Sequence, residues 1–353
     1  MLEGAPGNRR TPPVRPGNGP TGPKPDRTGD RRPGAPHRPG DRSREGKAAQ
    51  EEGVMPSHMV VVGIDGSPQS MAAADWAALE ARRTGRPLRL VHAWHPLATD
   101  ADYPLHAESR HRWVENRLSA VHQTLAERFP GLRIEVERVA EAPVKVLLAE
   151  EAELLVLGSR GLSGMSGHLL GSVSLSVIAR TARPVVLVRA DFDGRAEESG
   201  TVVLGLDLRH YGTAPIDFAF RAAAARGASL LVVHAWNPKL VYGYASAPLD
   251  EELTAELQER EERSLTGVLA PWRAKYPEVA VTGRVTAGSA GRVLIEAAGG
   301  AGLLVTGHQL DHPGHSSRIG HVTHGVLHHA ACPVAVVPHD GAPDGDRDGG
   351  PAA

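Results

Sequence analysis

The segment with the clearest chemical potential is the glycine- and serine-rich stretch 158–174, which reads GSRGLSGMSGHLLGSVS. Its five glycines and five serines lie between the apolar runs LLVL and PVVLV. Glycine lets a backbone approach a ligand closely, and the free N–H groups at a helix start attract anions. The segment therefore favours phosphate binding. It contains no lysine and no GxGxxG pattern, so it is neither a Walker A loop nor a dinucleotide fingerprint.

The elements around this loop alternate apolar strand runs with helical patterns, which is typical of a parallel sheet with helices on both faces. A helix that starts near Ser172 follows the loop, and we expect Leu175, Ile178, Ala179 and Ala182 to dock it on the sheet. In the first half we predict strands at 59–65, 88–94, 134–139, 154–158 and 185–188. We predict helices at 68–83 (with Ser67 as N-cap), 143–151 and around the stripe Val114, Leu118, Val121 and Leu125.

The same succession of elements occurs twice. Asp65, His92 and Trp94 correspond to Asp207, His234 and Trp236 at an offset of 142, and LLVLG (154–158) corresponds to LLVTG (303–307) at an offset of 149. The sequence thus predicts two tandem α/β domains with open, five-stranded parallel sheets. We expect a Pro/Gly/Arg-rich disordered tail at 1–57, a first domain at 58–191, a second domain at 200–338 and a disordered tail at 339–353.

Composition bounds the class of protein. The net charge is −2, although residues 1–50 carry 11 Lys+Arg against 5 Asp+Glu, so no specific nucleic-acid partner is expected. A single cysteine, Cys332, excludes an intramolecular disulfide, and no apolar run reaches the length of a membrane span. A cytoplasmic location is expected. The sequence leaves Met1, Met55 and Met59 open as the start.

The loop spacing G158-x2-G161-x9-G171-S172 resembles the signature of ATP-binding universal stress proteins. The runs VVVGIDGS, LVHAW and SVSLSVIARTARPVVLV agree, so residues 59–190 are similar to that family, as are 201–338. The resemblance implies a Rossmann-like, adenine nucleotide alpha hydrolase-like fold in each domain. It also implies that the two domains pack as an intramolecular pseudo-dimer, and it leaves a further homodimer open.

The resemblance further implies an adenine nucleotide as partner, with ATP as cofactor, with or without Mg²⁺. The family places phosphates on the loop and the base and ribose near the first two strands. The residues that match these roles are Asp65, Ala93, Gly158, Arg160, Gly161, Gly171, Ser172, Val173 and Ser174. A carboxylate can accept ribose hydroxyls, although Asp65 could instead cap the following turn. No metal-ligand set is predicted.

The second half departs from the signature. Leu310 stands at the second glycine position, Pro313 follows, and His321 replaces the serine after Gly320. Leu310 brings a Cβ to the point of closest phosphate approach. We therefore expect a degenerate second site, which retains Asp207, Ala235, Gly307 and Gly320.

Histidines gather in the degenerate segment. His321, His324 and His328 fall on one helical side and could bind a transition metal. Helix registration instead places His324 and His328 at the positions of Leu175 and Ala179, so we expect them to face the sheet. His92 and His234, inside strands, are expected to be packed and hydrogen-bonded.

Three functions stay open at this point. The first is a regulatory stress-response protein that binds ATP in its first domain. The second is a weak ATP hydrolase, which would lack a dedicated general base beyond Asp65. The third is a tandem scaffold that binds no nucleotide.

Overall fold

The structure is a computed structural model of the 353-residue chain. It describes residues 58–95, 104–159, 171–192, 200–236, 251–310 and 319–340. The tail predicted at 1–57 lies outside the described residues, as does most of the glycine-rich loop. Of the tail predicted at 339–353, only residues 339 and 340 are described, and His339 is the last residue of a strand rather than part of a tail.

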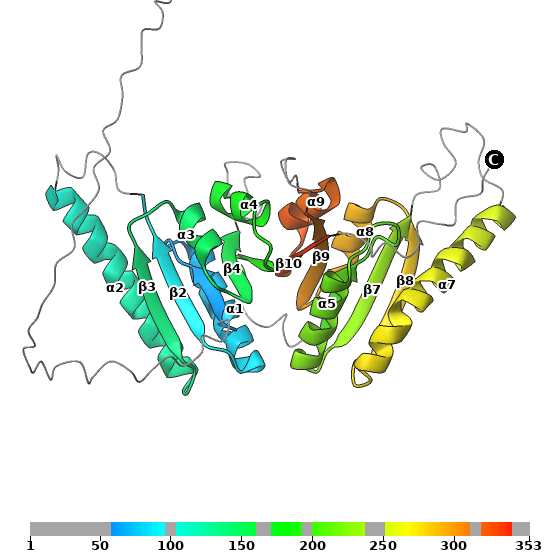
Figure 1. The fold of residues 1–353 in the computed structure, drawn as a ribbon, viewed down its shortest axis with the longest axis horizontal. Coiled ribbons are helices and arrows are strands. Elements are labelled where there is room, and N and C mark those ends of the chain that lie inside the picture. The colour runs from blue at the N-terminus through cyan, green and yellow to red at the C-terminus, as the bar shows by residue number, and fades with distance from the viewer. Residues whose placement is uncertain are drawn as a thin grey trace, which may run out of the picture. The chain divides into compact units, whose positions relative to one another are not determined.

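The chain forms two successive sets of strands and helices (Figure 1). The first half comprises β1 (Val60–Gly63), α1 (Pro68–Thr84), β2 (Leu88–Ala93), α2 (Pro104–Arg128), β3 (Ile134–Val139), α3 (Pro143–Ala149), β4 (Leu154–Ser159), α4 (Ser172–Ile178) and β5 (Val185–Arg189). The second half comprises β6 (Thr201–Gly205), α5 (Thr213–Arg226), β7 (Ser229–Trp236), α7 (Glu251–Lys275), β8 (Val281–Ala287), α8 (Ala290–Ala297), β9 (Leu303–Gln309), α9 (His321–His329) and β10 (Val334–His339).

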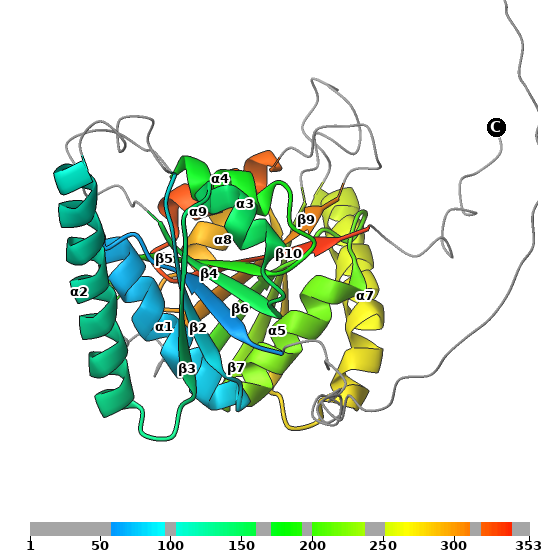
Figure 2. The same ribbon diagram turned by 60° about the vertical axis from the view of Figure 1, so that its left-hand side comes forward.

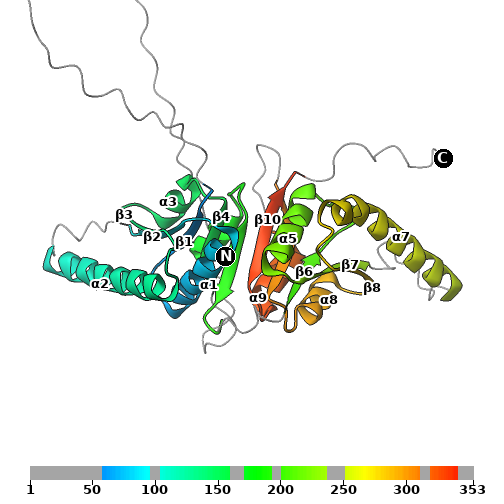
Figure 3. The same cartoon turned by 90° about the horizontal axis from the view of Figure 1, so that it is seen from below.

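The strands form one ten-stranded sheet in the order β3-β2-β1-β4-β5-β10-β9-β6-β7-β8. All pairs within each half are parallel, so the predicted five-stranded parallel sheets are confirmed. The halves join where β5 and β10 pair antiparallel, with Val186 opposite Ala335. Figure 3 shows these two strands side by side at the centre.

Helices cover both faces of the sheet (Figure 2). One hydrophobic core lies beneath α1, α2, α5 and α7, and the other lies beneath α3, α4, α8 and α9. The strands between them are apolar on both sides because neither face meets water. This layering leaves the strand ends as the places where polar side chains can gather.

Local signals fix the bounds of α1 as predicted. Ser67 is the N-cap, since its hydroxyl accepts the Ser70 N–H, and Pro68 opens the helix. Gly85 ends the helix with a left-handed φ of 65°, a conformation that suits glycine. In α2, Leu118, Val121 and Leu125 are buried as the predicted stripe requires.

The helix after the glycine-rich loop is rotated relative to our expectation. Ile178 is buried as expected, together with Ser174 and Val177. Leu175 and Ala179 are only partly buried, and Ala182, which lies beyond the end of α4, is exposed. Ser174 Oγ donates to Gly158 O at 3.3 Å, which ties the side of the helix that carries Ser174 to β4.

The same rotation in α9 overturns the expected orientation of its histidines. Thr323, Val326 and Leu327 are the buried residues, His324 is exposed, and His328 is half-buried. Thr323 Oγ1 donates to Gly307 O at 3.3 Å, as Ser174 does to Gly158.

Among the described residues, no helix combines the length and apolar character needed to span a membrane.

Candidate functional site

A pocket of about 250 Å³ lies at the carboxyl ends of β1, β2 and β4, beside the start of α4. This edge is where open α/β sheets bind ligands. The structure brings the predicted first-site residues that it describes into this pocket: Asp65, Ala93, Gly158, Gly171, Ser172, Val173 and Ser174. Arg160 and Gly161, also predicted for the site, lie outside the described residues.

Asp65 follows β1 and presents an exposed carboxylate to the pocket. Its Oδ1 accepts the Ser67 N–H at 2.9 Å, so the residue also caps the β1–α1 turn. Burial would raise the pKa of Asp65, but hydrogen bonds from Ser67 and Ser70 outweigh it and hold the pKa below its ordinary value. The carboxylate is therefore ionised at neutral pH and can accept hydroxyl donors.

His92 supports the strand end that carries Asp65. The buried imidazole makes a 2.7 Å hydrogen bond through Nδ1 to the carbonyl of Ile64, and its ring stacks on Trp94 with centroids 5.6 Å apart. In the second half, Nδ1 of His234 makes a 2.9 Å hydrogen bond to the carbonyl of Leu206. The expectation of packed, hydrogen-bonded histidines is confirmed at both positions.

The close packing of β4 against α1 requires a glycine, without a side chain, at position 158. A Cβ at this position would lie 2.6 Å from the backbone carbon of Gln69, a contact that no rotamer change could relieve. At Gly171 the nearest atom to an added Cβ is Ser174 Oγ at 3.8 Å, so this position is open. Packing thus requires glycine at position 158 but not at position 171.

The Ser174 side chain contributes less to the pocket than we expected from the sequence. The residue is 5% exposed and its hydroxyl proton is engaged with Gly158 O. A bound anion would therefore meet the Ser174 backbone, whereas Ser172 is exposed at the first position of α4.

Sequence reasoning missed part of the lining. Gln69 in the first turn of α1, and Pro143 and Leu147 of α3, also border the pocket. Pro143 opens α3 next to the end of β3, so the rule that pockets form at the carboxyl edge could have pointed to it.

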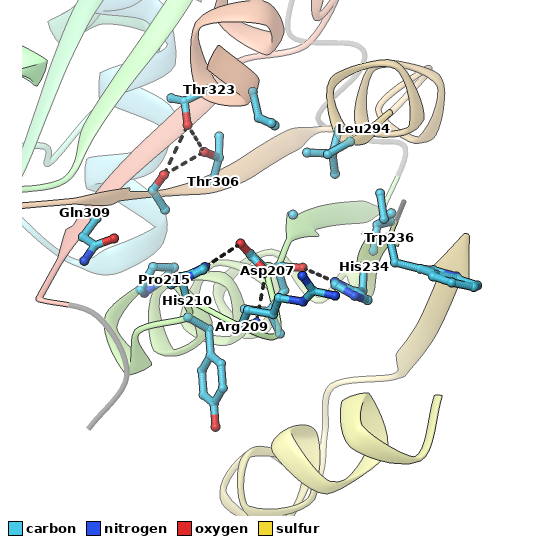
Figure 4. A pocket seen from close by; sticks show the side chains of 18 of the residues that line it. Asp207, Arg209, His210, Pro215, His234, Trp236, Leu294, Thr306, Gln309 and Thr323 are labelled. Carbon is cyan, nitrogen blue, oxygen red and sulfur yellow. Dashed lines mark hydrogen bonds and ion pairs between the residues drawn. The ribbon is translucent and has the colours of Figure 1, made fainter. Parts of the chain in front are cut away.

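A second pocket, of about 660 Å³, lies at the corresponding edge of the other half (Figure 4). Asp207, Ala235 and Gly307 line it as predicted. Gly320 is the N-cap residue of α9 and is not among the lining residues; the next residues, His321 to Thr323, are.

The loop after β6 differs from its counterpart in the first half. α5 begins at Thr213, which corresponds to Met71 at the repeat offset, so the first turn found in α1 is absent here. Asp207 accepts the Arg209 N–H at 3.0 Å, as Asp65 accepts the Ser67 N–H, but it also pairs with Nδ1 of His210 at 3.3 Å. Figure 4 shows the Asp207 and His210 side chains turned toward each other.

His339 fills the space left by that missing turn. A Cβ on Gly307 would lie 2.8 Å from His339 Nε2, and a Cβ on Gly212 would lie 2.5 Å from the His339 Cβ. Burial, together with the nearby His308, lowers the pKa of His339. Leu310 donates its N–H to His339 O at 2.9 Å, which extends the pairing of β9 with β10. His339 thus borders the second pocket at a place where the first pocket has no corresponding lining residue.

Comparisons with known proteins agree with this architecture. The model of the universal stress protein family matches residues 57–189 and 199–338. A universal stress protein of Mycobacterium tuberculosis is 31% identical over 289 residues, covering 79% of this chain and 96% of the relative. One from Mycolicibacterium smegmatis is 28% identical over 288 residues, with the same coverage.

Among solved structures, a universal stress protein from Archaeoglobus fulgidus has the same fold. It superposes with a TM-score of 0.58 at 17% identity and covers 80% of this chain and 98% of that one. With both halves matched by the family model and the sequence similarity extending over most of the chain, this protein belongs to the universal stress protein family.

Proposed function

We propose that the first half binds one adenine nucleotide, ATP, and that the protein acts as a regulatory nucleotide-binding protein of the cytoplasm. The observation that carries this proposal is the convergence of the signature residues on one pocket. Residues far apart in sequence, from Asp65 to Ser174, line the same cavity at the ligand-binding edge of the sheet.

Each part of the pocket suits one part of the nucleotide. The ionised Asp65 can accept hydrogen bonds from ribose hydroxyls, and the backbone at the end of β2, at Ala93, can face an adenine edge. Backbone amides at 171–174 meet the phosphates together with Arg160 and Gly161 of the loop. Mg²⁺, where present, would be held by the phosphates and water, with Asp65 as the nearby carboxylate.

Binding is favoured over turnover. Among the described residues that line the first pocket, Asp65 is the ionisable one, and it already caps a turn. A hydrolase needs a base or a positioned group to activate water. We therefore expect ATP to remain intact while it is bound.

Calorimetric titration of the full chain with ATP tests the proposal. We expect a stoichiometry of about one, and loss of binding in Gly161→Leu, which introduces the residue found at the matching position of the second half, Leu310. Asp65→Asn should weaken binding roughly 10- to 100-fold, the value of a hydrogen bond to a charged group.

Asp207→Asn is the matched control, since it makes the same change in the second half and should leave the affinity for ATP unchanged. Unaltered ATP binding by Gly161→Leu would refute the assignment of the first-half loop. Wild-type protein that binds no ATP would favour the scaffold function.

A further inference from the structure

α9 carries a pair of histidines that the proposed nucleotide site does not use. His324 is exposed and His328 is half-buried, and they lie one helical turn apart. Their Nε2 atoms are 3.4 Å apart, and their ring centroids are 4.5 Å apart with an interplanar angle of 51°. The two nitrogens therefore face a common region beside the helix.

This separation is longer than an ordinary N–H···O hydrogen bond, which spans about 2.7–3.2 Å. The centroids are also too close for two imidazoles arranged end to end, so the rings lie partly side by side. The two rings are therefore close enough for a weak hydrogen bond between their Nε2 atoms.

A shared metal ion is compatible with the same separation of the two Nε2 atoms. Imidazole nitrogens bind Zn²⁺ at about 2.0–2.1 Å, and two such ligands at a tetrahedral angle are ~3.4 Å apart. The Nε2 atoms of His324 and His328 already have that spacing. We propose that His324 and His328 form a site for one divalent transition-metal ion of the zinc class, bound through both Nε2 atoms, with water as the remaining ligands.

The helix holds this pair in place from its other side. Thr323, Val326 and Leu327 are buried against the sheet, and the Ala330 N–H donates to Val326 O at 2.8 Å at the end of the helix. The backbone positions of the two histidines are thus fixed before an ion arrives, so binding has to order only their side chains.

The site is open and specific to the second half. Among the described residues, no group of three or more His, Cys, Asp or Glu side chains is arranged for a metal, so within this part of the chain the proposed site has two protein ligands. The matching positions of α4 hold Leu175 and Ala179, which offer no ligand. His321, three residues before His324, lines the second pocket.

Equilibrium dialysis of the metal-stripped full chain against Zn²⁺ tests the proposal. We expect His324→Ala to bind about one ion fewer than the wild type, and His328→Ala to lose the same ion. The double variant should lose no more than either single one, because both side chains share one ion. His122→Ala, which removes an imidazole from α2, is the control and should retain the full stoichiometry.

A second measurement guards against misfolding. Zn²⁺ should raise the resistance of the wild type to urea, and this increase should be smaller in His324→Ala, because an ion that binds the folded helix stabilises it by mass action. Equal zinc binding by the wild type and His324→Ala, with equal stabilisation, would overturn the proposal. ATP is absent from both experiments, so their outcome is independent of the nucleotide site.

Discussion

Glu80 of α1 and Arg226 of α5 form a buried ion pair between the two halves of the chain, with side chains exposed by 7% and 2%. Arg226 reaches both carboxylate oxygens, at 2.6 and 3.4 Å, and its guanidinium lies 5.7 Å from the ring centre of the buried Trp76. The pair has no symmetric counterpart, because the repeat places Ala222 opposite Glu80 and Thr84 opposite Arg226. The ion pair can therefore form when a first half packs against a second half, but not when two copies of the same half pack together.

Breaking this pair should be costly. Glu80→Ala leaves a buried guanidinium without its partner, and we expect the free energy of unfolding to fall by about 3–5 kcal/mol. Replacing both partners with apolar side chains, as in Glu80→Met with Arg226→Leu, should recover most of that loss, because Arg226 Nε has no hydrogen-bond partner among the described residues.

Urea denaturation of the single and double variants measures both effects. Arg292→Ala serves as the control, since it breaks an exposed pair with Glu296 within α8 and should cost less than about 0.5 kcal/mol. A loss at Glu80→Ala no larger than this control would contradict the role assigned to the buried pair.

Alanine at Gly158 should be far less tolerated than alanine at Gly307. At Gly158 the added Cβ meets the Gln69 backbone at 2.6 Å, and we expect a loss of about 1–3 kcal/mol in the free energy of unfolding. At Gly307 the nearest atom is the imidazole nitrogen of His339 at 2.8 Å, and that ring can turn aside. Thermal unfolding of both variants makes the comparison; equal losses would mean that the α1 backbone yields as easily as a side chain.

Ser174→Ala should separate stability from ligand binding. The variant loses the hydrogen bond to Gly158 O and leaves a partly buried carbonyl less well satisfied, so the free energy of unfolding should drop by about 1 kcal/mol. ATP affinity, measured by calorimetry, should stay within about twofold, since the backbone N–H is unchanged. A large loss of affinity with unchanged stability would show that the hydroxyl itself contacts the nucleotide.

The stability of the fold should depend on Asp65 in the acid range. Because its pKa in the folded protein lies below the ordinary value of 3.8, the ionised carboxylate stabilises the fold at neutral pH, and this stabilisation is lost as the pH falls through the folded pKa. The difference in unfolding free energy between wild type and Asp65→Asn should therefore be constant near neutrality and shrink below about pH 4. A difference that stays constant down to pH 2 would contradict the lowered pKa.

Cys332 should be inert in the folded protein. Burial raises the pKa of its thiol to about 11, so the thiolate is scarce at pH 8 and reagents have little access to it. Labelling with iodoacetamide should be slow in buffer and rapid in urea, as mass spectrometry of the intact chain can show. Rapid labelling of the native protein would indicate that the β10 end of the second half opens.

The architecture was predictable because each element depends on local signals. Ser67, Pro68 and Gly85 fix the bounds of α1, and the repeat at an offset of 142 assigned the second half by analogy. The edge where the candidate site lies followed as well, since parallel strands end at the same side of a sheet. Asp65 and Gly158 lie together at this edge because each is at the carboxyl end of a parallel strand.

The rotation of α4 and α9 was not predictable from the apolar pattern. Leu175 and His324 were expected to face the sheet, but the hydroxyls of Ser174 and Thr323 bind carbonyls of β4 and β9 and turn the helices away from that register. A period of 3.6 residues fits two neighbouring faces of a short helix almost equally well, so the apolar pattern alone does not choose between them.

By itself, the sequence determined the duplicated chain of strands and helices, the edge of the sheet where the candidate site lies and the difference in sequence between the two loops, since these depend on neighbours along the chain. The tertiary structure alone decided that Glu80 meets Arg226, that His339 fills the place of a missing helical turn beside Gly307, and that two histidines of α9 face each other. These relationships follow from packing between segments distant in sequence, or from which side of a helix that packing leaves exposed, and no local pattern encodes either.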